Sequence, residues 1–373
     1  MIRFEAVRKQ YPDGTVAVDQ LDLEARTGEI TVLVGPSGCG KTTSLRMINR
    51  MIEPTSGRIL LDDRDTATIK LEQLRRGMGY VIQQAGLFPH RTVVDNVATV
   101  PVLVGTPRRA ARRRALELLE LVGLPPELAG RYPAQLSGGQ QQRVGVARAL
   151  AADPPVMLMD EPFSAVDPVV RAQLQDEFLR LQGELGKTIV FVTHDIDEAV
   201  KLGDRVAVLR VGGRLAQIDS PRELLAHPAD SFVAGFVGRD RGYRALGFTA
   251  AGELPLRQET VVALGEPLSV VGGRSSDGWV LVVDADGRPL GWLGSAVDGS
   301  SPDGRVAAEM LNLGGTLAGD GASLRAALDA ALSSPSGRGV VVSAEGVLIG
   351  TVTASQVLAR IEEERAGAGA AGG

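Results

Sequence analysis

A short apolar run that ends in a glycine-rich turn constrains this chain more than any other feature. Residues 30–34 read Ile-Thr-Val-Leu-Val, and the next nine read Gly-Pro-Ser-Gly-Cys-Gly-Lys-Thr-Thr. The run predicts a buried strand, and the glycines predict a loop whose backbone N–H groups surround anionic oxygens. The residues from Lys41 onward predict a helix whose N-terminus faces the same anion. The pattern therefore indicates a phosphate-binding loop between a strand and a helix.

Several positions of this loop have an expected role in binding a nucleoside triphosphate. Lys41 is expected to reach the terminal phosphates as a compact cation, and Thr42 to offer its hydroxyl to Mg²⁺. A glycine-rich turn with a chance Lys-Thr pair is the competing interpretation, and the amphipathic residues 44–48 that follow argue against it. The residues expected to contact ATP here are Gly35, Pro36, Ser37, Gly38, Cys39, Gly40, Lys41, Thr42 and Thr43.

A second motif opens another predicted helix with Ser137, Gly138, Gly139 and Gln140. A serine hydroxyl, glycine amides and a helix N-terminus together form an anion site. An ordinary capped helix is the alternative, and it would be preferred for the Ser-Gly-Gly tripeptide alone. A few residues further on, however, an apolar run ends in two carboxylates, and this order of parts favours the functional interpretation.

With these motifs in this order, the chain resembles the ATP-binding subunit of an ABC transporter over roughly its first two-thirds. Residues 136–140, Leu-Ser-Gly-Gly-Gln, are similar to the signature loop of that family. The resemblance implies that this loop faces the phosphate-binding loop of a second copy, so that two ATP molecules lie between two subunits. It also assigns roles to residues outside the loops: Asp160 (Mg²⁺ and ATP), Glu161 (catalytic base), Asp167 (D-loop), His194 (switch histidine), Gln83 (Q-loop, catalytic, with Thr42 and Asp160 a magnesium contact) and Tyr11 (adenine stacking).

The chemistry can also be argued from the residues alone. Hydrolysis of ATP requires charge neutralisation on the phosphoryl group that is transferred, and a positioned water molecule. Lys41, Thr42 and Mg²⁺ can supply the first, and Glu161 at the end of a buried strand can orient and deprotonate the water. The alternatives are a solvated acidic strand end for Asp160-Glu161 and a purely structural role for His194. The other motifs favour the catalytic interpretation.

The predicted fold class is α/β, with a P-loop ABC ATPase domain that contains a helical signature subdomain, over residues 1–240. A smaller α+β domain of two tandem CBS-like units is expected over residues 241–366, with a disordered Gly/Ala tail at 367–373. The charge changes at this boundary, since residues 241–373 contain no lysine, 10 arginines and 15 carboxylates. The net charge of −5 therefore lies in the C-terminal part. A capping box at residues 220–223 predicts one helix through residue 237 that ends the ATPase domain.

The C-terminal part contains an internal repeat, because residues 279–293 recur as residues 338–352. Each copy predicts a strand, an acidic-glycine turn and a second strand, an arrangement that resembles a tandem CBS pair. Nucleotide-binding units of that family commonly have Gly-x-x-Thr-x-x-Asp after the second strand. The second copy has Gly350, Thr353 and Gln356 instead, and the first has Gly294 and Val297 at the matching places. Nucleotide binding is therefore doubtful, and a structural, dimerising or regulatory role stays open.

The densest basic run, residues 108–114, contains five arginines. A nucleic-acid surface is conceivable, but helically spaced leucines follow and the first 240 residues carry no net charge, so a solvated helix face is the preferred interpretation. No nucleic-acid partner is expected. By resemblance, the lobe between Gln83 and Ser137 contacts membrane subunits, with residues 87–90 near that contact.

Composition agrees with a protein of a reducing compartment, because Cys39 is the sole cysteine and no intrachain disulfide can form. No apolar stretch approaches the ~20 residues that a membrane-spanning helix needs, and the N-terminal residues lack a signal-peptide core. The expectation is a peripheral protein at the cytoplasmic face of the cell membrane, docked on separate permease subunits.

A single ATPase domain of importer type followed by a CBS-like pair resembles the subfamily that energises uptake of osmoprotectants such as glycine betaine, carnitine, choline or proline. Residues 78–90 agree with that subfamily. The resemblance implies permease subunits, an extracytoplasmic solute-binding protein and a second copy of the chain as partners. The alternatives are an ATPase of another ABC importer, for an amino acid, sugar or metal, a non-transport ABC ATPase, and a nucleotide-sensing switch.

Overall fold

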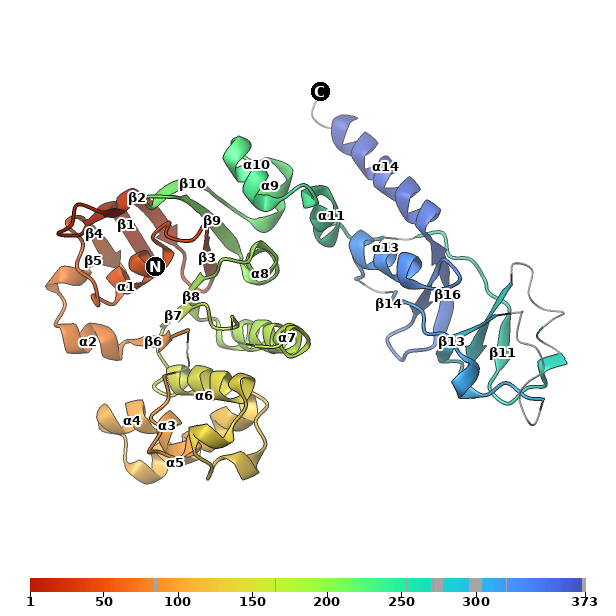
Figure 1. Ribbon diagram of the computed structural model, residues 1–373, viewed down its shortest axis with the longest axis horizontal. Helices are drawn as coiled ribbons and strands as arrows, with labels where there is room; N and C mark the ends of the chain where they lie inside the picture. The colour runs from red at the N-terminus through yellow and green to blue at the C-terminus, as the bar shows by residue number, and fades with distance from the viewer. Residues whose placement is uncertain are drawn as a thin grey trace. The chain divides into compact units, whose positions relative to one another are not determined.

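The computed structural model describes most of the 373 residues in two compact units, Met1–Gly238 and Arg239–Gly373 (Figure 1). The described residues are 1–83, 86–164, 166–252, 254–269, 271, 278–294, 304–319 and 321–370, with side chains left aside at 169, 317, 318 and 365–370. The sequence placed the boundary at residue 240, two residues further on.

A six-stranded sheet forms the centre of the first unit, in the order β10-β9-β3-β8-β7-β6. All neighbouring strands are parallel except β10, which pairs antiparallel with β9. The central strands β3, β7 and β8 are fully buried, as their apolar sequences require of parallel strands covered on both faces. The strands are β3 (Ile30–Val34), β6 (Met78–Val81), β7 (Val156–Asp160), β8 (Thr188–Val192), β9 (Arg205–Arg210) and β10 (Arg214–Asp219).

A second, antiparallel sheet of four strands has the order β2-β1-β4-β5. Its apolar face shares one buried cluster with helix α1 and the central sheet, including Phe4, Leu21, Leu45 and Ile59. Its elements and those that follow are β1 (Ile2–Gln10), β2 (Val16–Ala25), α1 (Lys41–Ile48), β4 (Ser56–Leu61), β5 (Arg64–Asp65), the 3-10 turn η1 (Thr66–Thr68) and α2 (Leu71–Arg76).

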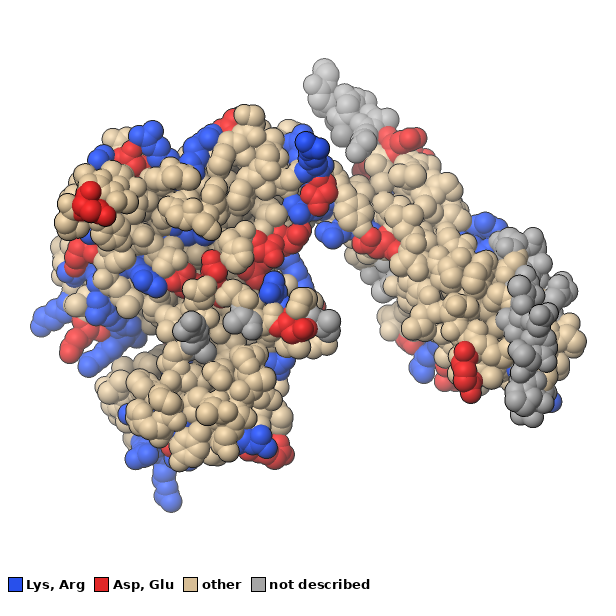
Figure 2. Space-filling view, in the orientation of Figure 1, with Lys and Arg blue, Asp and Glu red and all other residues tan. Residues whose placement is uncertain are grey.

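A helical lobe lies between β6 and β7 in the sequence, as predicted for the signature subdomain (Figure 1). The basic run lies on α5 of this lobe, where Arg112 Nη1 is 2.8 Å from Asp95 Oδ1 and Arg114 Nη1 is 2.9 Å from Glu117 Oε2. On the face shown in Figure 2, charges of both signs are interspersed over the first unit. The lobe comprises α3 (Val93–Val97), α4 (Thr99–Leu103), α5 (Arg108–Leu121), η2 (Pro126–Leu128), η3 (Pro133–Gln135) and α6 (Gly138–Leu150).

Four further helices complete the first unit: α7 (Pro168–Leu185), α8 (Ile196–Leu202), α9 (Pro221–Ala226) and α10 (Ser231–Val237). The single helix predicted to run from residue 221 to 237 is wrong, because α9 and α10 are separate. Pro228 has no N–H to donate and its ring disfavours helical geometry at the preceding His227, which has φ −128° and ψ 66°. Asp230 then caps a new helix by accepting from the N–H groups of Phe232 and Val233.

The second unit repeats one three-stranded arrangement, β11-β12-β13 and β14-β15-β16. In each sheet the first pair is parallel and the second antiparallel, with register irregularities at matching places, Val282/Val283 and Val341/Val342. The elements are α11 (Arg241–Ala245), η4 (Leu246–Phe248), β11 (Val261–Ala263), β12 (Trp279–Val283), β13 (Pro289–Gly294), η5 (Ala308–Met310), β14 (Thr316–Ala318), α13 (Leu324–Ser333), β15 (Arg338–Val342), β16 (Leu348–Thr353) and α14 (Ala354–Ala370).

Buried contacts join the two repeats. Trp292 of β13 is fully buried against the guanidinium of Arg338 on β15, whose carbon Cζ is 4.7 Å from the indole ring centroid. Arg338 Nε lies 3.3 Å from Glu259 Oε1, which also accepts a 2.6 Å hydrogen bond from the Thr351 hydroxyl. Helix α14 continues to Ala370, so residues 367–370 are helical where the sequence predicted a disordered tail. Residues 371–373, and Val297 of the first repeat, lie outside the described part of the chain.

Candidate active site

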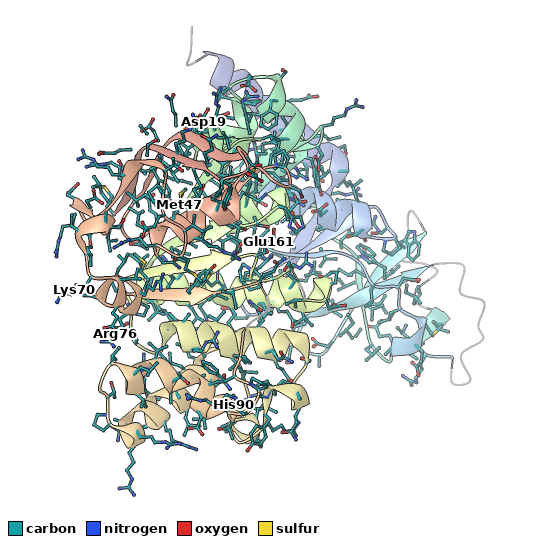
Figure 3. The ribbon with its side chains drawn as sticks, turned by 60° about the vertical axis from the view of Figure 1, so that its left-hand side comes forward. Asp19, Met47, Lys70, Arg76, His90 and Glu161 are labelled. Atoms are coloured by element: carbon teal, nitrogen blue, oxygen red, sulfur yellow. The ribbon has the colours of Figure 1, made fainter. Side chains whose placement is uncertain are left out.

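The glycine-rich loop connects β3 to α1, as predicted, and lines a pocket of about 260 Å³ with Ala17 and Glu161. Glu161 is labelled in Figure 3. Gly40 precedes the first helical residue with φ +90°, which a side chain would strain. A Cβ at this position would also lie 2.2 Å from the Ala17 carbonyl oxygen. Glycine is therefore required where the loop passes close to β2 and turns into α1.

Lys41, on the first residue of α1, points into the loop rather than into solvent. Its Nζ donates to the carbonyl oxygens of Gly35, at 2.7 Å, and Pro36, at 3.1 Å, and lies 3.8 Å from Cys39 Sγ. Burial raises the pKa of the Cys39 thiol above its ordinary value, against the opposing effect of Lys41, so the thiol is kept neutral. No thiolate therefore lies beside the Lys41 side chain to compete with phosphate oxygens for it.

The sheet order explains why sequence-distant motifs meet. The phosphate-binding loop follows β3 and His194 follows β8. Asp160 ends β7, Glu161 comes directly after it, and Gln83 follows β6. These four strands are adjacent and parallel. The carboxyl ends of parallel strands lie at one edge of a sheet, where ligands bind in folds of this type. Side chains up to about 160 residues apart in the sequence are thereby brought together.

Asp160 is buried and held by helix α1 through both carboxylate oxygens. Its Oδ1 accepts a 2.8 Å hydrogen bond from the Thr42 hydroxyl, and its Oδ2 lies 3.6 Å from Arg46 Nη2. Burial raises the pKa of the Asp160 carboxyl, and the Thr42 and Arg46 contacts oppose that shift. The hydroxyl and carboxylate form a hard oxygen donor pair, which is the ligand chemistry that Mg²⁺ prefers.

Glu161 extends in a different direction and is held from two sides. Its Oε2 accepts from Gln83 Nε2 at 3.2 Å, and its Oε1 lies 3.2 Å from His194 Nδ1. The residue has φ +47°, a left-handed conformation that is uncommon outside glycine. Its own N–H donates to the Val192 carbonyl at 2.9 Å, which fixes that backbone against β8. Strain of this kind recurs at functional sites, where the surrounding contacts maintain it.

The signature segment caps α6. Ser137 Oγ accepts from the Gln140 N–H at 3.3 Å, and Gln140 Oε1 accepts from the Ser137 N–H at 3.0 Å, a reciprocal capping box. Over the described residues, none of residues 137–140 lines the pocket of the phosphate-binding loop in the same chain. The structure therefore brings the strand-end residues together and leaves the signature segment apart from them.

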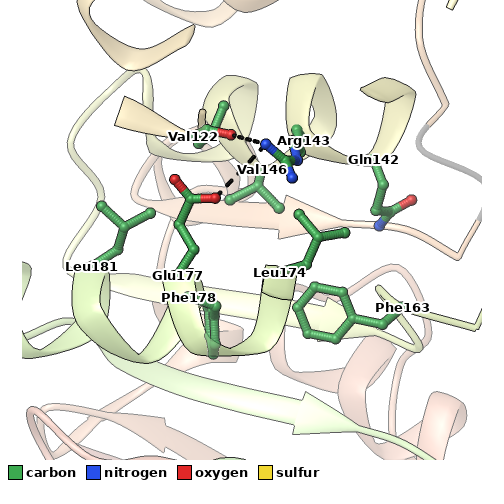
Figure 4. Close-up of a pocket in the computed structure, with 9 residues that line it drawn as sticks. All are labelled: Val122, Gln142, Arg143, Val146, Phe163, Leu174, Glu177, Phe178 and Leu181. Atoms are coloured by element: carbon green, nitrogen blue, oxygen red, sulfur yellow. Dashed lines mark hydrogen bonds and ion pairs between the residues drawn. The ribbon is translucent and has the colours of Figure 1, made fainter. Parts of the chain in front are cut away.

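Helix α6 packs on α7 around an apolar cavity of about 30 Å³, too small for more than a water-sized occupant (Figure 4). At its rim Arg143 Nη1 donates to the carbonyls of Gly123, at 2.8 Å, and Val122, at 3.2 Å, and lies 3.8 Å from Glu177 Oε2. These contacts fix the helix that begins at the signature segment. The cavity is lined by Val122, Gln142, Arg143, Val146, Phe163, Leu174, Glu177, Phe178 and Leu181.

Two predicted site residues, Tyr11 and Asp167, are not among the described residues that line the pocket of the phosphate-binding loop. Tyr11 is half-buried in the turn between β1 and β2, with Lys9 Nζ 5.3 Å from its ring centroid. Asp167 is exposed at the start of α7, where its carbonyl accepts from the Arg171 N–H at 2.7 Å. Both assignments stay predictions.

Sequence reasoning missed Arg46. It lies four residues after Thr42 on the same helix, so both side chains point from one face toward Asp160. The i, i+4 spacing after the loop was the signal that could have revealed it. Arg171, Gln175 and Glu198, which connect α7 to α8, were also missed, and no motif pattern marks them.

Comparisons with known proteins identify the family of this chain. The sequence matches the family described as "ABC transporter" over residues 18–164. An osmoprotectant import ATP-binding protein of Salmonella typhimurium is 49% identical over 302 residues, 79% of this chain and 79% of that protein. A glycine betaine uptake system ATP-binding protein of Escherichia coli is 46% identical over 303 residues, 79% of this chain and 97% of that protein.

Solved structures show the same fold. A dimeric ATP-binding cassette in a post-hydrolysis state, bound to ADP and Pi, superposes with a TM-score of 0.54 at 35% identity, covering 59% of this chain and 99% of that chain. The cbiO1 component of a Clostridium perfringens ABC transporter complex has a TM-score of 0.56 at 31% identity, covering 61% of this chain and 90% of its own.

The fold and the site thus define an ABC-type ATPase. The chain belongs to the ATP-binding proteins of ABC transporters, at identities that place it among importer subunits. In the part of the chain that is described, no helix is both long and apolar enough to cross a bilayer. The assignment of the second unit to a CBS pair stays a prediction.

Proposed function

We propose that this chain hydrolyses ATP to drive import of quaternary-ammonium osmoprotectants such as glycine betaine, carnitine or choline. Relatives 49% and 46% identical over 79% of the chain are named for osmoprotectant import and glycine betaine uptake. Another, from Bacillus subtilis, is named for glycine betaine, carnitine and choline transport and is 53% identical over 241 residues, 65% of this chain and 63% of that protein. The observation that carries the catalytic part is the Glu161 carboxylate, held by Gln83 and His194 at the phosphate-binding loop.

The proposed mechanism uses this chain's residues for positioning. Lys41 leaves the Gly35 and Pro36 carbonyls to neutralise the terminal phosphates, while the loop N–H groups bind their oxygens. Glu161 accepts a proton from the attacking water, and the contacts with Gln83 and His194 keep its carboxylate aimed at that water. Because phosphoryl transfer depends on orientation and electrostatics, these few groups suffice.

Thr42 and Asp160 are proposed to hold Mg²⁺, with Gln83 as a further contact. The fit is supported by the adjoining hydroxyl and carboxylate oxygens, 2.8 Å apart. Bound by these residues, the cation would supply positive charge that neutralises the phosphates. Arg46 keeps the second carboxylate oxygen of Asp160 occupied, so the first stays oriented toward Thr42.

The signature segment is proposed to serve the ATP of a second copy. The capped N-terminus of α6, with its serine and two glycines, is suited to an anion but lies outside the pocket of its own chain. One of the structural neighbours is a dimeric cassette. In a pair of chains, the signature segment of each chain would therefore complete the ATP site of the other.

The helical lobe is proposed to dock on the permease at the cytoplasmic face of the membrane. A groove of about 380 Å³ there is lined by both charged and apolar residues, including Asp95, Arg108, Val102 and Leu103. Leu103 is 69% exposed, and Figure 3 labels His90, another lining residue, on this lobe. A solute-binding protein outside the cell is proposed to select the solute.

The catalytic proposal is tested by steady-state ATP hydrolysis of the purified full chain. Glu161→Gln is expected to bind ATP and to lose about 100-fold or more of turnover, because a general base contributes on that order. Lys41→Ala is expected to lose ATP affinity instead. Glu184→Gln, on an exposed pair at the end of α7, is the matched control and keeps wild-type turnover. Wild-type turnover by Glu161→Gln would reject the base assignment.

The transport proposal needs a separate test in a host that lacks its own osmoprotectant uptake. Co-expression of the chain with its permease and binding protein is expected to restore uptake of radiolabelled glycine betaine, carnitine or choline. The Glu161→Gln variant expressed at the same level should not restore it. Restored uptake of an amino acid or a sugar, with none of the quaternary amines, would replace this substrate class with another.

A further inference from the structure

Helices α7 and α8 begin beside two parts of the proposed mechanism. Helix α7 starts directly after the loop residues Val166 and Asp167, and α8 starts two residues after His194. Three polar links tie the helices together: Arg171 to Asp195, Gln175 to Glu198, and Lys201 to both Asp176 and the Ala172 carbonyl. The loop and the histidine are thus attached to one connected pair of helices.

Arg171, in the first turn of α7, makes the link nearest to the N-termini of the two helices. Its Nη2 donates to the Val166 carbonyl at 3.1 Å, and its Nη1 lies 4.0 Å from Asp195 Oδ2. Asp195 follows His194 directly and caps α8, accepting from the N–H groups of Asp197 at 2.8 Å and Glu198 at 3.3 Å. One guanidinium therefore contacts the backbone of the loop and the residue that fixes the backbone after His194.

The pair below it is buried. Gln175 and Glu198 are 7% and 6% exposed, and Gln175 Nε2 donates to Glu198 Oε1 at 3.0 Å. A polar pair in this position is costly to bury, and an apolar pair would pack the two helices without that cost. The polar pair instead specifies how α7 and α8 are aligned, because its hydrogen bond is satisfied in only one alignment of the two helices.

We propose that Arg171, supported by the buried Gln175–Glu198 pair, is a positioning residue that couples Val166, just before α7, to His194. Through Arg171 and Asp195, the position of the Val166 backbone is linked to that of the histidine that faces Glu161. This inference rests on the proposed roles of Glu161 and His194. It adds an intrachain link between the start of α7 and the catalytic base.

If Arg171 had a purely structural role, its removal would lower turnover only by destabilising the fold, and the melting temperature would fall. Its side chain is 30% exposed and that of Asp195 is 39% exposed, so their 4.0 Å contact contributes little to the stability of the fold. If Arg171 is a positioning residue, removal of its guanidinium should leave the melting temperature nearly unchanged and should still lower turnover. Stability and turnover therefore separate the two roles.

The first measurement compares ATP hydrolysis by full-length variants. Arg171→Met is expected to lower kcat about tenfold with KM for ATP within about twofold, because coupling residues act on the reacting state and not on initial binding. Arg171→Lys should recover part of kcat, since the charge is kept. Arg180→Met, which removes an arginine from the exposed Arg180–Glu184 pair of the same helix, is the control and should behave as wild type.

The second measurement places Arg171→Met in a His194→Ala background. If Arg171 acts through the histidine, the double variant should turn over within about twofold of His194→Ala alone, a non-additive result. A further tenfold loss, wild-type kcat for Arg171→Met, or an equal loss in Arg180→Met would overturn the coupling. If His194→Ala itself hydrolyses ATP like the wild type, the proposed role of the histidine fails first, and the two failures are distinct.

Discussion

Asp160 and Glu161 are consecutive carboxylates with different surroundings. Asp160 is 3% exposed and bound by Thr42 and Arg46, whereas Glu161 faces Gln83 and His194. The left-handed backbone at Glu161 turns the second carboxylate out of the strand and toward the pocket. One position is thereby suited to hold a cation and the other to orient water.

Glu198 provides a residue-scale prediction about pH. Burial raises the pKa of this carboxyl above its ordinary 4.5, against hydrogen bonds from Thr193 and Gln175 that lower it, and nearby Asp195 adds to the rise. A carboxyl whose pKa is higher in the folded state stabilises the fold fully below its unfolded-state pKa, and this contribution is lost as pH rises through the folded value. Glu198→Gln has no such pH-dependent loss.

We therefore expect the melting temperature of Glu198→Gln to rise relative to the wild type as the pH is raised from 4.5, the ordinary pKa of the carboxyl, toward neutrality. Thermal unfolding at several pH values checks this. Glu184→Gln, at an exposed site on α7, is the control and should show no such trend. A difference between Glu198→Gln and the wild type that stays constant across this range would contradict the prediction.

At the scale of elements, helices α6 and α9 have the same kind of N-terminal cap, but their N-termini differ in proposed role. Ser137 caps α6 and Ser220 caps α9 through the same hydrogen bond, from the third residue's N–H to the serine hydroxyl, at 3.3 Å in both. Only the first of these caps belongs to the predicted signature segment. The two serines are therefore matched in structure and differ in proposed function.

This match gives the element-scale prediction. Ser137→Ala and Ser220→Ala should each cost about 1 kcal/mol of unfolding free energy, the typical value of an N-cap hydroxyl. Only Ser137→Ala should also lower ATP turnover, while ATP binding to the single chain stays intact. Denaturant unfolding and steady-state hydrolysis measure the two effects. Equal turnover in both variants would remove the signature role from Ser137.

At the scale of the whole molecule, the first unit contains all the proposed catalytic residues and a hydrophobic core of its own. The second unit has separate cores, including the cluster around Leu281, Trp292 and Val340 that joins its repeats. Gln356, where nucleotide-binding CBS units have aspartate, is engaged with Thr353 and with the Pro255 carbonyl. The second unit is therefore proposed to regulate hydrolysis without taking part in it.

Truncation after Gly238 tests this division. The shortened chain is expected to keep basal ATP hydrolysis within about twofold, because all the proposed catalytic residues lie in the first unit, which has its own hydrophobic core. In the assembled transporter it should weaken the dependence of transport on ionic strength, since screening of the acidic second unit would no longer matter. An unchanged salt response would reject the regulatory role of the second unit. Loss of basal hydrolysis would show that the first unit alone is not sufficient for catalysis.

The sequence by itself determined the local parts of this protein. The strand, loop and helix around residues 30–48, the cap at Ser137 and the repeat of residues 279–293 all depend on near neighbours, so pattern and propensity predict them. The helix expected across residues 221–237 was wrong for a reason that was also local, because the effect of Pro228 was overlooked.

Only the tertiary structure decided which distant groups meet. The order of β3, β8, β7 and β6 places Gln83 and His194 on either side of Glu161. The Arg171–Asp195 and Gln175–Glu198 contacts likewise depend on how α7 lies against α8. Such contacts have no periodic or adjacent signature in the chain, because they arise from the packing of elements whose order in space differs from their order in sequence.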